Sequence, residues 1–274
     1  MNLAIFFSNL KSSRGGMIAW GAFGFLFGLL VMYIYPSIGD VSGISEYLEN
    51  LPEQFKAAFG LTGEGVSLLT PEGFYSLEAF VSVEYLSWWP PVLAIYAIFA
   101  AGGIVAREVE RGTMDLLLSQ PVHRYQVVIS KFAVFLTALL VVSIVSLAGL
   151  AAGFALIEEK ADLLGVSLAL LQSFLLVMAV AGYSALFSCL FLDPRKTQMA
   201  AGVLTAGLYI LNFMAPSLGS FDWAKKISLF YYYQPLPIVQ NAALNWAGVG
   251  IYLGVTVVCF IASLVVFQRR DIVA

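Results

Sequence analysis

Charged residues are scarce in this sequence, and cysteine and histidine are scarcer. Of its 274 residues, 11% are charged and 60% are hydrophobic, whereas soluble proteins carry about 25% charged residues. One histidine and two cysteines are too few for a zinc or haem site. Cys189 and Cys259 both lie inside apolar runs, so we expect free, buried thiols and no disulfide. The composition is that of an integral membrane protein, for which we expect no metal.

The sequence also lacks the motifs of an enzyme. It contains no GxxxxGK[ST] run, the loop that binds nucleotide phosphates in ATPases, so this chain is not expected to hydrolyse ATP. Ser184 has no histidine partner in any expected span. Eight acidic residues and one lysine between Asp40 and Glu84 exclude a nucleic-acid surface there. We therefore expect no catalytic residue and no cofactor in this chain.

Six apolar runs are long enough to cross a membrane, for which about 20 residues are needed. The expected fold class is an all-α integral membrane protein with six transmembrane helices, forming one domain over 1–274. None of the runs has an ionisable residue at mid-depth, which disfavours a proton relay or an ion-coupled transporter. The expected spans are 16–36, 87–106, 127–156, 163–192, 197–218 and 248–267.

Three further segments have their own character. Residues 1–15 form an amphipathic helix that we expect to lie in the membrane interface. Residues 38–85 form a polar segment that is too long for a turn. Residues 220–247 are aromatic and interrupted by proline, so we expect them to enter the membrane from one side without crossing it. The apolar face of the first segment comprises Leu3, Phe6, Phe7 and Leu10.

Small local patterns mark several of the spans. Trp88 and Trp89 fit an aromatic belt where the second span begins, and the two prolines after them fit a helix start. Three spans contain two glycines separated by three residues, a spacing that lets helices approach closely. These pairs are Gly24 and Gly28, Gly149 and Gly153, and Gly250 and Gly254.

The distribution of Lys and Arg predicts the orientation. With both termini in the cytoplasm, ten basic residues lie on the cytoplasmic side and four lie outside, in agreement with the positive-inside rule. The protein is then a multi-pass protein of the cell membrane. Segments 38–85 and 220–247 are extracytoplasmic, and the loop 107–126 is cytoplasmic. The ten residues are Lys11, Arg14, Arg107, Arg111, Arg124, Lys131, Arg195, Lys196, Arg269 and Arg270.

The loop after the second span is the one charge-dense run between two long apolar segments. Gly112 permits a left-handed turn that would end the helix of the second span. Thr113 suits the N-cap of a new short helix, and Leu116, Leu117 and Leu118 give that helix an apolar surface. On local physics alone, a charged loop without further function is an equal alternative. Residues three apart that can pair on a helix surface are Arg107 with Glu110 and Glu108 with Arg111.

Residues 107–131 have the sequence REVERGTMDLLLSQPVHRYQVVISK. This stretch resembles the signature of ABC transporter permeases of the type 2 export class. That family shows an acidic-Arg-Gly-Thr segment, a Leu-rich block, a Pro and a Lys that opens the third span. That family also has an interfacial N-terminal helix, six spans, cytoplasmic termini and a broken re-entrant segment before the sixth span. Residues 1–12 and 221–247 of this chain resemble the interfacial helix and the re-entrant segment. The run 51–60 also resembles external segments of bacterial members.

The resemblance implies roles for particular residues. It implies a coupling helix that docks in a cleft of a separate ABC ATPase, and a polar network that supports this helix. His123 replaces a small polar residue often seen in the family and receives no role. The implied coupling residues are Thr113, Met114, Asp115, Leu116, Leu117, Leu118, Ser119 and Gln120. The implied network residues are Arg107, Glu108, Glu110 and Arg111.

The resemblance also implies partners and a cargo. Two ATPase subunits would carry the ATP and magnesium, and a second permease, identical or paralogous, would sit alongside this one in the bilayer. Aromatic, uncharged spans indicate an amphipathic cargo such as a drug, peptide or lipid. The possible path residues are Phe23, Phe27, Phe99, Tyr209 and Phe213, and the possible outer gate residues are Tyr231, Tyr232 and Tyr233.

Other interpretations stay open at this level. Each path residue could simply contact lipid or neighbouring helices, and the three tyrosines could form an interfacial belt. For the whole protein, the alternatives are a membrane sensor or assembly protein that binds through 38–85, and an ion-coupled secondary carrier.

Overall fold

The computed structural model describes residues 2–38, 76–114, 123–158, 162–214 and 223–270. Within these ranges all regular structure is helical, and six helical stretches are long and apolar enough to cross a membrane. The predicted fold class is therefore confirmed. The six stretches are Leu3–Ser37, Leu77–Gly102, Arg124–Leu156, Leu163–Phe191, Pro194–Met214 and Trp246–Arg269. The acidic segment predicted over 38–85 lies mostly outside the described residues.

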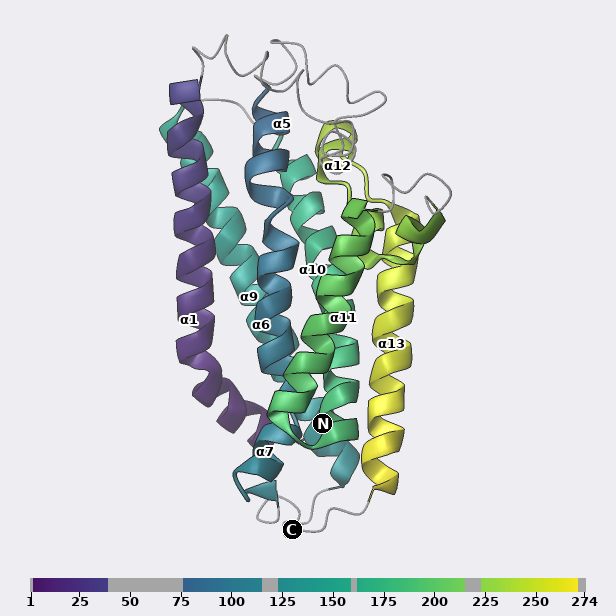
Figure 1. The fold of residues 1–274 in the computed structure, drawn as a ribbon. Coiled ribbons are helices and arrows are strands. Elements are labelled where there is room, and N and C mark those ends of the chain that lie inside the picture. The colour runs from purple at the N-terminus through teal and green to yellow at the C-terminus, as the bar shows by residue number, and fades with distance from the viewer. Residues whose placement is uncertain (1, 39–75, 115–122, 159–161, 215–222, 271–274) are drawn as a thin grey trace.

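The helices form an elongated bundle around α10 (Leu163–Phe191), as Figure 1 shows. This helix contacts α6 (Trp89–Gly102), α9 (Arg124–Leu156), α11 (Pro194–Met214) and α13 (Trp246–Arg269). Over half of its most apolar window is buried within the chain, against 17% for α11 and for α13. The outer helices therefore present apolar side chains to the surroundings of the chain, as helices in a bilayer do.

The first helix, α1 (Leu3–Ile34), contains both the predicted interfacial helix and the predicted first span. Its helical bonding is unbroken, and Figure 1 shows it bending near its start. The Asn2 side chain caps it by accepting hydrogen bonds from the amides of Ala4 and Ile5. Leu3 and Phe7 remain 59% and 63% exposed, as a face that rests on lipid requires. The interfacial position of these first turns stays a prediction.

The second stretch differs from its prediction at both ends. It begins ten residues earlier, with α5 (Leu77–Val81) and one π-helical segment, η3 (Ser82–Leu86), before α6. The prolines occupy the first turn of α6, as predicted. Trp89, however, is fully buried and stacks on Tyr85, so its assignment to an interfacial belt was wrong. Trp88 is 45% exposed and can still belong to one.

This longer stretch also changes the distribution of charge along the helices. Glu78 and Glu84, which lay outside the predicted second span, lie within the second stretch. Lys131 lies within the third stretch, as it did within the predicted third span. These two stretches have 26 and 33 residues, more than the roughly 20 that cross the hydrocarbon region. The three charges lie within ten residues of a helix end, so the middle of each stretch is still uncharged.

Two of the three glycine pairs bring α1 and α9 together. A side-chain carbon added at Gly149 would lie 2.5 Å from the carbonyl oxygen of Phe25, and one added at Gly28 would lie 3.1 Å from the amide nitrogen of Leu150. Only glycine permits an approach this close. The third pair, Gly250 and Gly254 on α13, has no other atom of the described chain within 4 Å of that added carbon.

The segment before the last span folds back at the end of the bundle opposite to α7 (Ala106–Glu110) (Figure 1). It contains a short 3-10 helix, η5 (Leu229–Tyr232), and the seven-residue helix α12 (Pro235–Asn241). Neither is long enough to cross a bilayer. The depth to which this segment enters the membrane stays a prediction.

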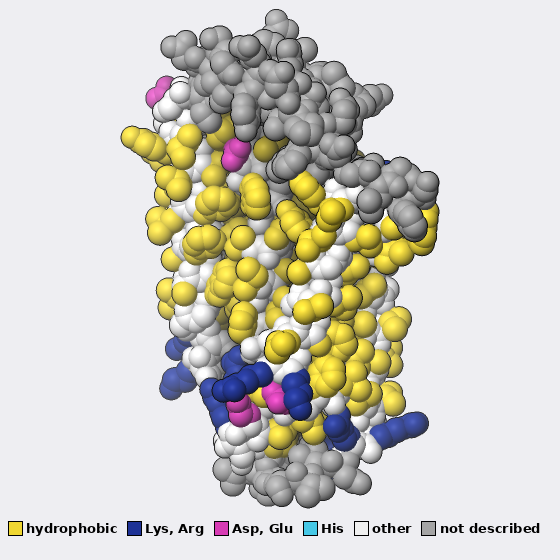
Figure 2. Space-filling view, in the orientation of Figure 1, with side chains coloured by type: hydrophobic (Ala, Val, Ile, Leu, Met, Phe, Trp, Pro, Cys, Tyr) yellow, Lys and Arg dark blue, Asp and Glu magenta, His cyan; other side chains and the backbone are white. Residues whose placement is uncertain are grey.

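Basic side chains gather at the end of the bundle that carries α7, as Figure 2 shows. We call this the basic end. The described ends of the chain, Asn2 and Arg270, both lie there, because Asn2 bonds to α9 and Arg270 bonds to α10. Of the described Lys and Arg residues, Lys225 and Lys226 lie at the opposite end, beyond α11. This asymmetry is what the predicted orientation requires, although which side the basic end faces is still a prediction.

Candidate functional site

The candidate site is the basic end around α7, where a helix break follows the second span. The helix α6 ends at Gly102, and residues 103–105 form a turn before α7 begins at Ala106. The predicted span continued to Ala106, and its helix was expected to end further on, at a turn made by Gly112. The break explains why Arg107 and Glu108 stand on a separate short helix rather than on the end of α6.

The start of α7 is capped by a side chain from another helix. The hydroxyl of Ser188 on α10 accepts hydrogen bonds from the amides of Val105 and Ala106, at 3.1 and 3.0 Å. These first amides of a helix have no partner within it. Ser188 is fully buried, so water cannot replace it. The position of α7 is therefore fixed to α10.

A buried ion pair fixes α7 to α9 as well. The ammonium group of Lys131 lies 2.6 Å from Oε1 of Glu108, and it also donates to the carbonyl oxygen of Ile104 at 3.1 Å. The side chains of Lys131 and Glu108 are 7% and 20% exposed. Removing one member of a buried pair costs about 3–5 kcal/mol, because the other charge is left without a partner. Lys131 thus holds both the turn and α7.

Glu108 also closes the far end of α7. Its second carboxylate oxygen accepts a hydrogen bond from the Thr113 hydroxyl. Burial alone would raise the pKa of Glu108, but the hydrogen bonds from Lys131 and Thr113, together with the charges of Lys131 and Arg111, hold that pKa below its ordinary value. The carboxylate is therefore kept ionised at neutral pH.

The backbone after α7 forms the turn that the sequence predicted, one helix later than expected. Gly112 has φ +66°, and its amide donates to the Val109 carbonyl at 3.0 Å. The amide of Thr113 donates to the Glu108 carbonyl at 3.0 Å. This pair of bonds is the Schellman motif, which ends helices with a left-handed glycine. It turns the chain sharply towards residue 114.

The predicted coupling helix begins at this turn. Thr113 is half-buried, and Met114 is 2% exposed and belongs to the main apolar core. The predicted coupling residues Asp115, Leu116, Leu117, Leu118, Ser119 and Gln120 lie outside the described residues. The chain is described again from His123, and α9 begins at Arg124. The segment between them therefore starts and finishes on fixed elements.

Two arginines connect the remaining helices at this end. Arg270, after α13, donates to the carbonyl oxygens of Cys189 and Leu190 in the last turn of α10. The guanidinium of Arg124 donates to the carbonyl oxygen of Arg270 at 2.6 Å. Cationic side chains at a helix C-terminus satisfy its free carbonyls. At the start of α1, Asn2 exchanges two hydrogen bonds with Ser130 of α9. We call these contacts, with Glu108, Lys131 and Ser188, the polar base.

The structure places the predicted network residues differently from one another. Glu108 enters the polar base, but through Lys131 and not through Arg111. Arg107 lies over Gly103 and donates to the Phe99 carbonyl at 3.0 Å. Glu110 and Arg111 are exposed. Neither pair that the spacing allows on α7 is among the ion pairs of the described residues, in which Glu108 binds Lys131, although the charge of Arg111 still helps to lower the pKa of Glu108.

Lys131 and Ser188 were the residues that sequence reasoning missed. Lys131 was expected only to anchor the third span. A lysine seven residues after the start of a 33-residue apolar helix is itself a signal, because such a charge requires a partner. Ser188 carries no comparable signal, since serine is common in membrane helices.

The five predicted path residues do not form one cluster. Phe23 and Phe27 stack on each other at 5.9 Å and lie against Trp89. Phe99 is 51% exposed on α6. Tyr209 of α11 packs edge-on against Phe230 at 5.1 Å. Phe213 is half-buried on the same helix. They lie on three helices, of which α6 stands between α1 and α11 in Figure 1.

The three predicted gate tyrosines also have separate surroundings. Tyr233 is 8% exposed and donates to the Leu86 carbonyl at 3.1 Å, deep in the bundle. Tyr231 and Tyr232 are half-buried and meet edge-on at 5.0 Å. The buried amide of Gln172 donates to the Tyr232 carbonyl at 3.0 Å and accepts from the Asn245 amide at 2.9 Å. Gln172 thus holds the end of η5 and the start of α13 against α10.

In the part of the chain that the structure describes, no group of three His, Cys, Asp or Glu side chains is placed to hold a metal ion. Both cysteines are free; Cys189 is buried, as predicted, whereas Cys259 is only half-buried.

A bundle of six helices that are long and apolar enough to cross a membrane defines a multi-pass membrane protein. The comparison with known families agrees: residues 13–272 match the family described as ABC-2 family transporter protein, and the chain belongs to that family. A relative from Bacillus subtilis (strain 168), described as uncharacterized protein YhcI, is 27% identical over 209 residues. That match covers 65% of this chain and 64% of the relative, which is just under two thirds of the relative's length.

Proposed function

We propose that this chain is the permease subunit of an ATP-driven exporter, and that a separate ABC ATPase drives it. Membership of the ABC-2 transporter family supports the transport role. The absence of a phosphate-binding loop from the sequence supports a division of labour between two kinds of subunit. In this proposal ATP and magnesium bind to the partner, and this chain has no catalytic residue.

The polar base is the observation that carries the proposal. The segment 115–122 begins after Met114, whose side chain lies in the core, and ends before α9, whose Lys131 holds Glu108. An ATPase that grips this segment would therefore act on α7, α9 and α10 together, since Ser188 also holds α7.

Two ATPase subunits would dock on two permeases, which are either identical or paralogous. Closure of the ATPases on ATP would move both coupling segments and open a route between the permeases to the outside. The basic end then faces the cytoplasm, in agreement with the positive-inside rule. Both described chain ends lie at that end, which supports cytoplasmic termini.

The face formed by α6 and α11 is the candidate for contact with the second permease and with cargo. It exposes four large apolar side chains by 50–72%, and it contains no charge in the middle of either helix. Such a face suits an amphipathic drug, peptide or lipid-like cargo. The yellow side chains across the middle of Figure 2 include this region. The four residues are Ile95, Phe99, Met199 and Val203.

Co-purification with the ATPase tests the proposal. Leu117→Asp places a charge on the proposed docking helix and should abolish capture of the ATPase, while the permease remains inserted. Ile227→Asp makes the same chemical change at the opposite end, where Ile227 is 59% exposed, and should leave capture unchanged. If both variants capture the ATPase equally, the assignment of the coupling helix is refuted.

Reconstituted vesicles separate this proposal from a carrier. Export that requires ATP and the ATPase subunit supports the permease assignment. Transport by this chain alone, driven by an ion gradient, would favour the secondary carrier instead.

A further inference from the structure

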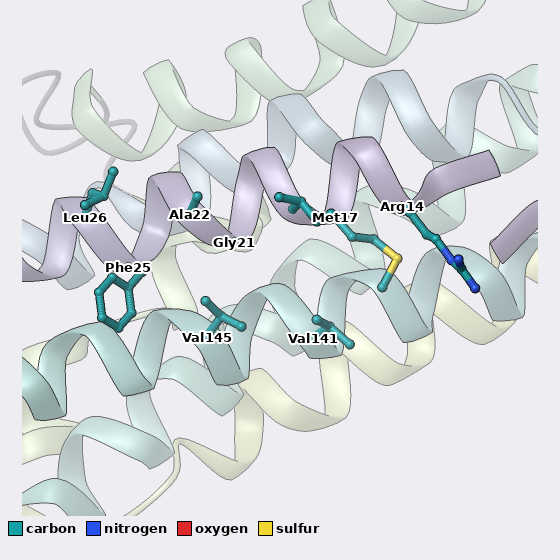
Figure 3. Close-up of a pocket in the computed structure, with 9 residues that line it drawn as sticks. Arg14, Met17, Gly21, Ala22, Phe25, Leu26, Val141 and Val145 are labelled. Carbon is teal, nitrogen blue, oxygen red and sulfur yellow. The ribbon is translucent and has the colours of Figure 1, made fainter. Parts of the chain in front are cut away.

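A groove runs along the outside of the contact between α1 and α9. It has a volume of about 530 Å³, within the roughly 300–1,000 Å³ of small-molecule sites. Figure 3 shows Arg14 at one end of the row of lining residues and Phe25 towards the other. Arg14 is the one charged residue among them; the others are Met17, Ile18, Gly21, Ala22, Phe25, Leu26, Val141 and Val145.

The groove exists because the two helices separate towards the basic end. They touch through backbone at Gly149, where an added carbon would lie 2.5 Å from the Phe25 carbonyl. One helical turn closer to the basic end, the same carbon at Gly21 would lie 3.5 Å from Val145, which is ordinary contact. A carbon added at Gly16 would have no neighbouring atom of the described chain within 4 Å. The hydrogen bonds between Asn2 and Ser130 then join the helices again.

The opening of the groove faces away from the bundle. Ile18 and Leu26 on its edge are 71% and 61% exposed, so its natural occupant comes from the bilayer. An apolar chain in the groove would cover Ala22 and the two valines and pass over Gly21, which is itself buried. Figure 3 shows Val141 and Val145 of α9 pointing towards α1 across this space.

The charge at one end specifies the rest of the occupant. Arg14 is exposed, and it makes no ion pair with any acidic group in the described ranges. Lys11 stands three residues earlier, on the same side of the helix. A guanidinium binds a phosphate through two parallel hydrogen bonds. Within the described residues neither Lys11 nor Arg14 makes an ion pair with an acidic group, so these two cations favour a headgroup with net negative charge.

We propose that this groove binds one anionic phospholipid of the leaflet at the basic end, with its phosphate on Arg14 and one acyl chain along Gly21. The site is separate from the face assigned to cargo, and the inference does not depend on the transport proposal. The lipid is a resident of the α1–α9 contact.

Native mass spectrometry of the purified full-length permease tests the site. The protein is titrated with phosphatidylglycerol or phosphatidylcholine, and with inorganic phosphate as the headgroup-free probe. We expect one tightly retained phosphatidylglycerol per permease. Arg14→Gln should weaken its binding about fivefold, the factor expected for one basic residue at a membrane surface. Gly21→Leu should fill the groove and abolish the tight site. The variant should still fold, because a carbon added at Gly21 is accommodated beside Val145.

Matched variants at the same end provide the controls. Arg195→Gln removes an exposed arginine from α11, and Gly202→Leu adds a side chain to that helix where nothing lies within 4 Å. Both should retain phosphatidylglycerol as the unmodified protein does.

Several outcomes would overturn the proposal. Equal losses in Arg14→Gln and Arg195→Gln would mean general attraction to a basic surface. Equal retention of both lipids, unaffected by either groove variant, would mean ordinary annular lipid. Competition by inorganic phosphate alone would mean an ion site without a chain. A change of oligomeric mass in Gly21→Leu with unchanged lipid binding would make the groove a contact between copies.

Discussion

Replacing Lys131 by methionine is the most direct perturbation of the polar base. Methionine fills much of the same space and removes the charge, so Glu108 keeps only the Thr113 hydroxyl and the Ile104 carbonyl loses its donor. Breaking a buried pair costs about 3–5 kcal/mol. Because the Glu108 side chain is still 20% exposed, water recovers part of this cost, and we expect a loss of about 3 kcal/mol.

The assay is thermal unfolding of the purified permease in detergent, followed by the fluorescence of its tryptophans. At roughly 2–4 °C per kcal/mol for chains of this size, Lys131→Met should lower the Tm by about 6–12 °C. The control is Lys196→Met. That lysine is 73% exposed and lies 4.0 Å from Asp193, and such surface pairs contribute about 0–1 kcal/mol.

A double variant separates pairing from loss of a side chain. Glu108→Leu combined with Lys131→Met removes both charges, so its cost should be lower than the sum of the two single costs by about 2 kcal/mol. The reasoning fails if Lys131→Met shifts the Tm no further than Lys196→Met, or if the two single effects simply add.

Three other predictions concern single contacts. The pKa of Glu108 is held below its ordinary value of 4.5. The stability that this carboxylate gives the fold is therefore fully present above pH 4.5 and is lost as the pH falls through the lower folded pKa. The decline of Tm on acidification should be smaller in Glu108→Gln. Gln172→Leu leaves the Tyr232 carbonyl and the Asn245 amide without this partner and should cost about 1–3 kcal/mol, whereas Ser173→Ala removes a buried hydroxyl that has no partner in the described chain and should be nearly neutral by the same unfolding measurement. Gly149→Leu should destabilise by more than about 1–3 kcal/mol because Phe25 backbone occupies the space, and Gly250→Leu, which meets nothing within 4 Å, should not; equal Tm values would contradict the contact.

The long apolar runs were enough to predict six helices, because a membrane requires about 20 apolar residues in each span. The third and fourth spans agree with α9 and α10 to within three residues at each end. The start of the second span was missed because Glu78 and Glu84 interrupt its apolar character. Both nevertheless lie on helical turns, close to the point where the stretch begins.

The candidate site was predictable only in part. A glycine followed by threonine predicted the left-handed turn at Gly112, since that signal is local. The partners of Glu108 could not be predicted in this way, because they depend on which helices are neighbours in space. Ser188 lies 80 residues further along the chain than Glu108. The burial of Trp89 has the same origin: its ring fills the space beside Gly24, which only the placement of α1 creates.

The glycine contact between α1 and α9 determines where this bundle can flex. Backbone touching backbone leaves no side chain that can rotate to make room, so the two helices must travel as a single strut. Between α6 and α11 a side chain enters the contact, since a carbon added at Gly102 would lie 3.1 Å from Cγ2 of Thr197, and a side chain can change its rotamer. Any movement that the ATPase passes to α9 therefore carries α1 with it as one unit, and a hinge that widens the protein is expected between α6 and α11.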